Sequence, residues 1–182
     1  VAAVAKHYAL NSQELHRSTA NPVGLSPAES SVVDDRTLWE VFYPPFEATV
    51  EAGVASIMCS YNRVNGEHAC GSRKLLTEDL RGTLKFSGFV MSDWWALHDS
   101  SAAANGVDQE MPGRRDVRDP WHDGLGYFAP KNLDAPLTAQ MATRIVGGML
   151  RAGAFNWTPP CTVGCDCDAL LYETVATNQQ HK

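Results

Sequence analysis

Polar side chains close three apolar runs of this chain, and their types suit chemistry on a sugar. Lys6 and His7 end the first run, Tyr61 follows the second, and Asp93 ends the third. A strand end can hold a carboxylate rigidly where neighbouring donors keep it ionised, which makes Asp93 a candidate nucleophile. Lys6 and His7 are adjacent donors that could bind hydroxyl groups, and Tyr61 offers a phenol.

Each of these side chains also has an ordinary structural interpretation. Asp93 precedes a helical pattern and could be its N-cap, which the pattern alone leaves at even odds with catalysis. Lys6 and His7 could form a solvated strand end. Met58 and Tyr61 could be core residues.

Further candidates lie on either side of Asp93 along the chain. The flat face of Trp94 could stack on a pyranose ring, although Trp94 and Trp95 are by their type more often packing residues. Asp108 and Glu110 could be a helix cap and a salt-bridge partner.

Short apolar runs alternate with helical patterns along most of the chain. Strands are expected at 1–10, 54–62, 88–93 and, more briefly, 107–113; helices are expected at 34–42, 45–53, 72–85, 95–106 and 137–153. The prolines at 44 and 45 should interrupt the first helical pattern, and Asn65 with Gly66 signals a turn. Such alternation predicts a parallel α/β fold. Four strands are about half of a (β/α)8 barrel, which typically takes about 250 residues.

Composition and charge exclude some classes of function. The 182 residues include 15 Lys and Arg, with a formal net charge of −6 and no dense basic run, so nucleic acid is not an expected partner. No apolar stretch approaches the roughly 20 residues that span a bilayer, so no membrane partner is expected. No signal peptide is visible. The chain opens without Met inside an expected strand, from which we expect upstream residues to be missing.

The cysteines and one sequon favour an oxidising compartment. Cys161, Cys165 and Cys167 crowd a segment containing Pro and Gly, which favours disulfides in a loop. Their C-x3-C-x-C spacing matches no zinc template, so no metal site is expected. The sequon at Asn156 is a glycosylation acceptor in a secretory context. An extracellular or secretory location is therefore expected.

Four segments, in their order along the chain, resemble one known family. They are "KHYALNSQELHR", "YPPFEATVEAGVASIMCSYNRVNG", "GFVMSDWWALHD" and "NGVDQEMPG". Each is similar to a motif of glycoside hydrolase family 3, the β-glucosidases and their relatives. The resemblance runs from Val1 to about Asn156, and four ordered motifs make it specific.

The resemblance implies a site for hydrolysis of β-glucosides. In that family a TIM-like barrel carries the nucleophile, here Asp93, and a following sandwich domain supplies an acid/base Glu. Lys6 and His7 would bind hydroxyls of the sugar at the cleavage subsite. Two carboxyls suffice for the chemistry, so no cofactor is implied.

Other residues receive a role from the resemblance alone. Met58, Tyr61 and Trp94 would line the sugar subsite around the nucleophile. Cys59 and Cys70 resemble a disulfide of secreted eukaryotic members.

The resemblance also implies that much of the enzyme lies outside the chain. Residues 1–156 would form the C-terminal half of the barrel, about its last four βα units, and residues 157–182 a Cys-rich tail or linker. The first barrel strands and the acid/base domain are absent, so the isolated chain is expected to be inactive. A β-glucoside or oligosaccharide is the expected substrate. A β-xylosidase and a non-catalytic carbohydrate-binding remnant remain alternatives.

Overall fold

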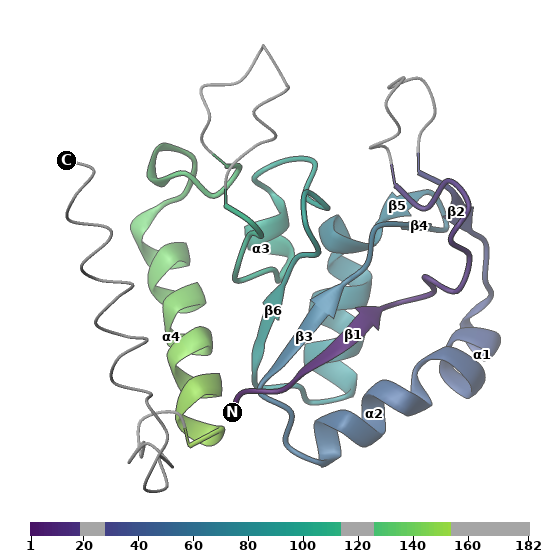
Figure 1. Ribbon diagram of the computed structural model, residues 1–182, viewed down its shortest axis with the longest axis horizontal. Coiled ribbons are helices and arrows are strands. Elements are labelled where there is room, and N and C mark those ends of the chain that lie inside the picture. The colour runs from purple at the N-terminus through teal and green to yellow at the C-terminus, as the bar shows by residue number, and fades with distance from the viewer. Residues whose placement is uncertain (19–27, 114–125, 154–182) are drawn as a thin grey trace, which may run out of the picture.

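Three parallel strands form the centre of the molecule. The computed structural model describes residues 1–18, 28–113 and 126–153. Within them, β1 (Val4–Tyr8), β3 (Ser56–Cys59) and β6 (Phe89–Met91) pair in the order β1-β3-β6. All three point the same way (Figure 1), so the residues that follow them meet at one edge of the sheet. The expected α/β class is confirmed, and each strand is shorter than its apolar run.

The expected fourth strand is wrong. Where residues 107–113 approach β6 there is only an isolated parallel bridge between Met91 and Gln109. The backbone N–H groups of Asp108 and Gln109 both donate to the carbonyl of Val90, which leaves no regular ladder. Pro112 then ends any pairing because it has no N–H to donate.

The core lies between the sheet and the helix that precedes β6. Successive side chains of β3 alternate in direction, and its Ile57 and Cys59 join the apolar cluster. The helix η3 (Lys74–Thr83) has π-type turns and presents a leucine stripe to that cluster, with Leu76, Leu80 and the following Leu84 all buried. Ser72 caps the start of this helix, because its hydroxyl accepts the N–H of Leu75 at 3.3 Å.

The two prolines bend the helix after β2 and do not separate it into distant parts. The elements α1 (Asp35–Thr37), η1 (Leu38–Phe42) and α2 (Pro44–Glu51) follow directly on one another. Both prolines occupy the first turn of α2, where backbone N–H groups have no partner within the helix. In the five-residue π-type turn of η1, Leu38 is buried while Val41 is exposed to solvent.

A second, small sheet lies near the carboxyl end of the main one. It pairs β2 (Ser30–Ser31), β4 (Arg63–Val64) and β5 (Glu67–His68). The expected turn joins β4 to β5: Asn65 has φ +49° and Gly66 φ +93°, the positive values that a type I′ hairpin needs. A 3-10 turn, η2 (Ala69–Gly71), follows, and a disulfide joins Cys59 to Cys70 with 5.2 Å between their Cα atoms.

The helix expected at 95–106 is mostly absent. Only α3 (Ala102–Asn105) forms. Trp95 has φ +60°, in the left-handed region that ends a helix, and the Asp99 carboxylate accepts the backbone N–H of Ser101, which starts the turn anew.

The long helix α4 (Ala135–Arg151) stands beside β6 (Figure 1) and follows the short turn η4 (Pro130–Asn132). The Asp134 carboxylate caps α4 by accepting the N–H of Leu137 at 2.7 Å. Gly148 allows the close approach to the sheet, because a Cβ there would lie 2.8 Å from both the Ala55 carbonyl and the Phe89 ring. Within the expected stripe, Met141 is buried, and Leu137, Ile145 and Met149 are half-buried.

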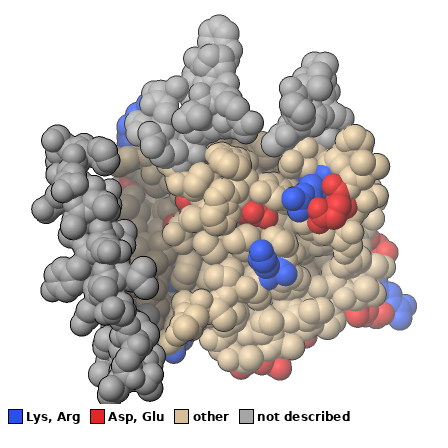
Figure 2. Space-filling model, viewed as in Figure 1, with Lys and Arg blue, Asp and Glu red and all other residues tan. Residues whose placement is uncertain are grey.

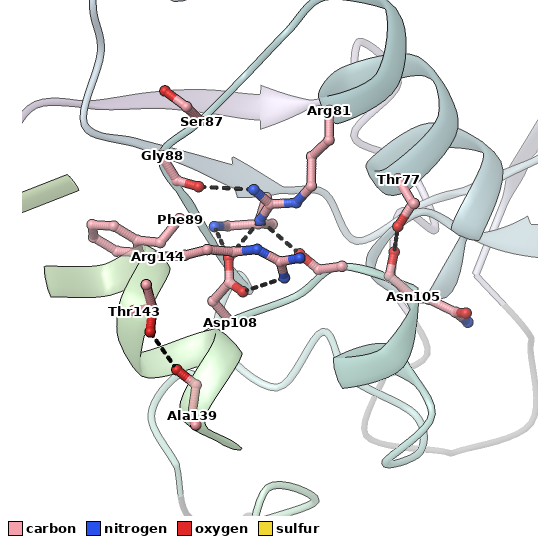
Figure 3. Close-up of polar contacts among 12 residues, drawn as sticks. Thr77, Arg81, Ser87, Gly88, Phe89, Asn105, Asp108, Ala139, Thr143 and Arg144 are labelled. Atoms are coloured by element: carbon pink, nitrogen blue, oxygen red, sulfur yellow. Dashed lines mark hydrogen bonds and ion pairs between the residues drawn. The ribbon is translucent and has the colours of Figure 1, made fainter. Parts of the chain in front are cut away.

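A buried ion cluster, which we call the Asp108 clamp, ties these elements to β6. Arg81 of η3 and Arg144 of α4 converge on the Asp108 carboxylate (Figure 3), and their Nη–Oδ distances are 2.5 and 3.0 Å. The same carboxylate accepts the backbone N–H of Val90 in β6 at 2.8 Å. Arg81 also donates to the carbonyls of Gly88 and Gly106. Burial raises the pKa of Asp108 despite the two arginines.

Asp108 therefore forms ion pairs here and not the helix cap that was expected for it. The two carboxylate oxygens of Glu110 accept the backbone N–H groups of Tyr127 and Phe128 at 3.0 and 2.9 Å. Glu110 therefore anchors a neighbouring loop.

Asp108→Asn should lower the free energy of unfolding by about 3–5 kcal/mol, because it leaves two partly buried guanidinium groups without a counter-charge. Urea unfolding of this variant and of the parent chain measures the difference. Arg36→Ala, which breaks the exposed pair with Glu40, is the control and should cost less than about 1 kcal/mol. Equal effects of the two substitutions would contradict the proposed importance of the clamp.

Candidate active site

The three strand ends bring together a carboxylate, an imidazole and a phenol. Asp93 follows β6, His7 lies in β1 and Tyr61 follows β3. His7 Nε2 lies 3.2 Å from Asp93 Oδ2, and the side chain of Asp93 is only 11% exposed. A neutral imidazole with its proton on Nε2 can donate a hydrogen bond to that oxygen.

Asp93 does not cap a helix. Its Oδ1 accepts the backbone N–H of the next residue, Trp94, at 2.8 Å, and its carbonyl accepts the N–H of Ala96 at 3.1 Å in a turn. No helix begins between Asp93 and Ala102, so the capping interpretation is wrong. The carboxylate has one oxygen fixed by the backbone and the other facing His7.

Two pKa shifts define the protonation states around the carboxylate. Burial lowers the pKa of His7; the positive charges of Lys6 and Arg17 act in the same direction, while Asp93 and Glu14 oppose it. Burial, the charge of Asp93 and a hydrogen bond with it raise the pKa of Tyr61 to about 12. Near neutral pH His7 is therefore uncharged and Tyr61 keeps its proton, so both can donate hydrogen bonds.

The other expected sugar-binding residues lie at the same edge of the sheet. Lys6 is exposed beside His7 in β1. Met58 is buried and lies opposite Met91, two residues before Asp93, in the β3–β6 register. Trp94 is 39% exposed and Trp95 48% exposed, so neither is enclosed by the core.

The sequence reasoning did not assign a role to Arg17. Its guanidinium carbon lies 4.9 Å from the centre of the Tyr61 ring, and its Nη1 lies 2.8 Å from Glu14 Oε2. Arg17 closes the first of the four family-like segments, which was the available signal. Its contact with Tyr61 joins residues 44 positions apart, which spacing could not reveal.

A histidine pair was also missed. The rings of His68 in β5 and His98 after β6 are stacked with 3.6 Å between their centres. Burial and the neighbouring His68 lower the pKa of His98 to about 4, against a smaller opposing effect of Asp99. Burial and Arg63 likewise lower the pKa of His68. The stack links the small sheet to the loop that carries Trp94.

Charges of both signs are interspersed on the face seen in Figure 2.

Among the described residues, no three His, Cys, Asp or Glu side chains are grouped so as to hold a metal ion. In the same ranges, no helix has the length and apolarity to cross a bilayer. Asn156, Cys161, Cys165 and Cys167, and the whole expected segment 157–182, lie outside the described residues.

Comparison with known proteins identifies the family. Residues 1–113 match the model described as the glycosyl hydrolase family 3 N-terminal domain. The chain belongs to glycosyl hydrolase family 3. Because the matching model is that of an N-terminal domain, the expectation that the chain covers the C-terminal half of the barrel stays a prediction.

Relatives of known name are family 3 β-glucosidases. "Probable beta-glucosidase E" of Emericella nidulans is 43% identical over 171 residues, which cover 90% of this chain and 16% of that protein. "Beta-glucosidase cel3A" of Pyricularia oryzae is 49% identical over 114 residues, which cover 62% of this chain and 14% of that protein. This chain therefore spans about a fifth or less of the length of these relatives.

Solved structures support the same family 3 assignment. The β-D-glucoside glucohydrolase of Trichoderma reesei aligns with a TM-score of 0.72 at 38% identity, over 85% of this chain and 21% of that one. The β-glucosidase of Chaetomium thermophilum aligns with a TM-score of 0.76 at 36% identity, over 85% of this chain and 19% of that one.

The stack of His68 and His98 should make this protein less stable in acid. The folded protein holds the pKa of His98 at about 4, below the usual 6.5, so between these values the unfolded chain binds more protons. Stability should therefore fall as the pH drops through this window. Thermal melting at about pH 7 and about pH 4.5 measures the fall, which His98→Phe should reduce because Phe keeps a ring but takes up no proton. An undiminished fall in the variant would contradict this assignment.

Proposed function

We propose that this chain carries the nucleophile of a retaining β-glycosidase that releases terminal non-reducing β-D-glucosyl residues. The observation that carries the proposal is the environment of Asp93. A largely buried carboxylate stands at a strand end, 3.2 Å from a His7 nitrogen and beside the protonated phenol of Tyr61. Membership of family 3 and the names of the relatives, which are β-glucosidases, support glucosides as the substrate class.

The chemistry follows from a carboxylate that remains ionised. An Asp93 oxygen attacks the anomeric carbon, forming a glycosyl-enzyme ester, while the bond to the leaving oxygen breaks and that oxygen takes a proton from a second carboxylic acid. The resulting second carboxylate then removes a proton from water, which attacks the anomeric carbon and releases Asp93. Oδ1 of Asp93 is held by the Trp94 N–H, which leaves Oδ2 as the attacking oxygen.

The neighbouring residues bind and orient the sugar in this proposal. Lys6 and His7 hydrogen-bond its hydroxyl groups, and the Tyr61 phenol donates to the nucleophile before attack. Met58 lines the subsite, and the partly exposed Trp94 stacks on the sugar ring. None of these roles requires a metal or an organic cofactor.

The second carboxyl group is a Glu outside these 182 residues in this proposal. The relatives are about five times longer, and three parallel strands with one bridge are part of a (β/α)8 barrel. Residues 1–156 then form the C-terminal half of the barrel, which is completed by the remainder of the protein. The Cys59–Cys70 disulfide and the sequon at Asn156 support a secreted location.

Asp93→Asn tests the proposed role of the nucleophile. In the protein that contains this chain together with its remaining domains, the substitution should lower kcat on an aryl β-glucoside at least about 10³-fold, because the neutral amide cannot form the ester. A 2-deoxy-2-fluoro glucoside should label the parent protein at Asp93, detected by mass spectrometry of peptides. Glu47→Gln, on α2, is the control for a lost carboxylate and should leave kcat unchanged. Retained turnover in Asp93→Asn, or a label on another residue, would refute the assignment.

The 182-residue chain alone should not hydrolyse an aryl β-glucoside above the buffer blank, because it lacks the acid/base Glu. Release of the aryl alcohol followed by absorbance measures this. Turnover that disappears in Asp93→Asn would show that the second carboxyl lies within the chain.

A further inference from the structure

The loop after β1 places a guanidinium group on the face of the Tyr61 ring. Arg17 Cζ lies 4.9 Å from the ring centre, within the range of a cation–π contact. The phenol of the same ring lies close enough to Asp93 for that carboxylate to raise its pKa. Tyr61 thus lies between Arg17 and the proposed nucleophile.

The backbone around Arg17 is held by specific contacts. The Arg17 N–H donates to the Glu14 carbonyl at 3.4 Å, and the two side chains form an ion pair at 2.8 Å. The preceding His16 has φ +59°, a conformation that few non-glycine residues adopt, and its carbonyl accepts the N–H of Glu29 at 2.8 Å. These contacts fix the direction of the chain just before Arg17.

An alternative role, in which Arg17 forms only a surface ion pair with Glu14, explains these contacts less well. Arg17 is 38% exposed and could be only a solvated partner of Glu14, a pair of small energetic value. Such a pair does not require the guanidinium plane to lie over an aromatic ring. The ring that it covers belongs to Tyr61, whose pKa the Asp93 charge helps to raise.

We propose that Arg17 is a positioning residue of this site, which holds the Tyr61 phenol against Asp93 and keeps the charge balance around His7. This inference rests on the proposed glycosidase function. Tyr61 has two rotatable side-chain torsions, and a cation on its face restricts both. The phenol then remains in place when the carboxylate changes from ion to ester.

The positive charge of Arg17 has a second effect, on the pKa of His7, that an uncharged side chain in its place would not have. The charged groups that act on His7 are Asp93 after β6, Lys6 in β1, and Glu14 and Arg17 in the following loop. Arg17 lowers the pKa of His7 and Glu14 raises it. Removal of Arg17 should therefore raise the pKa of His7, and removal of Glu14 should lower it.

The first experiment uses a double-mutant cycle in the protein that contains this chain and its remaining domains. Arg17→Met should lower kcat/KM on an aryl β-glucoside roughly 10- to 100-fold, the scale expected for a displaced catalytic group. Because Arg17 acts through the phenol, the same substitution should have little effect in a Tyr61→Phe background. Arg17→Lys, which keeps the charge, should recover part of the loss. Arg36→Met removes another arginine of an exposed pair and should leave kcat/KM unchanged.

The second experiment records the pH dependence of kcat/KM. The acid limb should move to higher pH in Arg17→Met and to lower pH in Glu14→Gln, because the two charges act oppositely on His7. Thermal melting of each variant separates this from loss of the fold; if Arg17→Met does not fold, Arg17→Lys and Glu14→Gln still test the direction of the shift.

The outcomes distinguish this inference from the function on which it rests. If the parent protein shows no turnover, or if Asp93 is not labelled, the proposed function is overturned, and this inference with it. An active parent whose Arg17→Met variant keeps the same kcat/KM and acid limb would overturn this inference alone. Equal losses in the parent and Tyr61→Phe backgrounds would also overturn it, because Arg17 would then act independently of Tyr61.

Discussion

The Asp108 carboxylate, buried between two guanidinium groups, joins four segments that are distant in the sequence. Arg81 comes from η3, Arg144 from α4, and the carboxylate also accepts the backbone N–H of Val90 in β6. Taking three charges out of water is costly, and only close contacts among them offset that cost. The cluster therefore tolerates little displacement, and it sets where β6 ends and where Asp93 stands two residues beyond that strand.

The segment that follows Asp108 also supports the residues on either side of Asp93, the proposed nucleophile. The Ser92 N–H donates to the Gln109 carbonyl, and the Ser92 hydroxyl accepts the Met111 N–H. Trp95, in its left-handed conformation, donates to the Met111 carbonyl. Asp93 thus lies in a short stretch whose neighbours are held on both sides, although no regular strand forms there. Rigid support of this kind is what a nucleophile needs to meet a substrate in one geometry.

Partial burial gives the site its protonation states. It lowers the pKa of His7 and raises that of Tyr61, so an uncharged donor and a protonated phenol face one carboxylate. If both groups were fully solvated, burial would not shift their pKa values from those of free side chains. The parallel sheet produces the shared environment, because it brings the ends of β1, β3 and β6 to the same edge.

The residue pattern predicted three of the parallel strands, the helix that forms as η3 and the Asn65–Gly66 turn. It failed where tertiary contacts replaced local preference. The helix expected after Asp93 is interrupted by Trp95, which backbone contacts with Met111 hold in a left-handed conformation. The fourth strand is replaced by side-chain and bridge contacts around Asp108.

The sequence by itself determined the family and the residue types available for chemistry, because four ordered motifs and alternating apolar runs depend on local order along the chain. Only the tertiary structure decided which of these residues act together. The approach of His7 and Tyr61 to Asp93, and of Arg17 to Tyr61, joins positions up to 86 residues apart. Such contacts arise from sheet register and loop direction, which the folded backbone sets and sequence spacing does not encode.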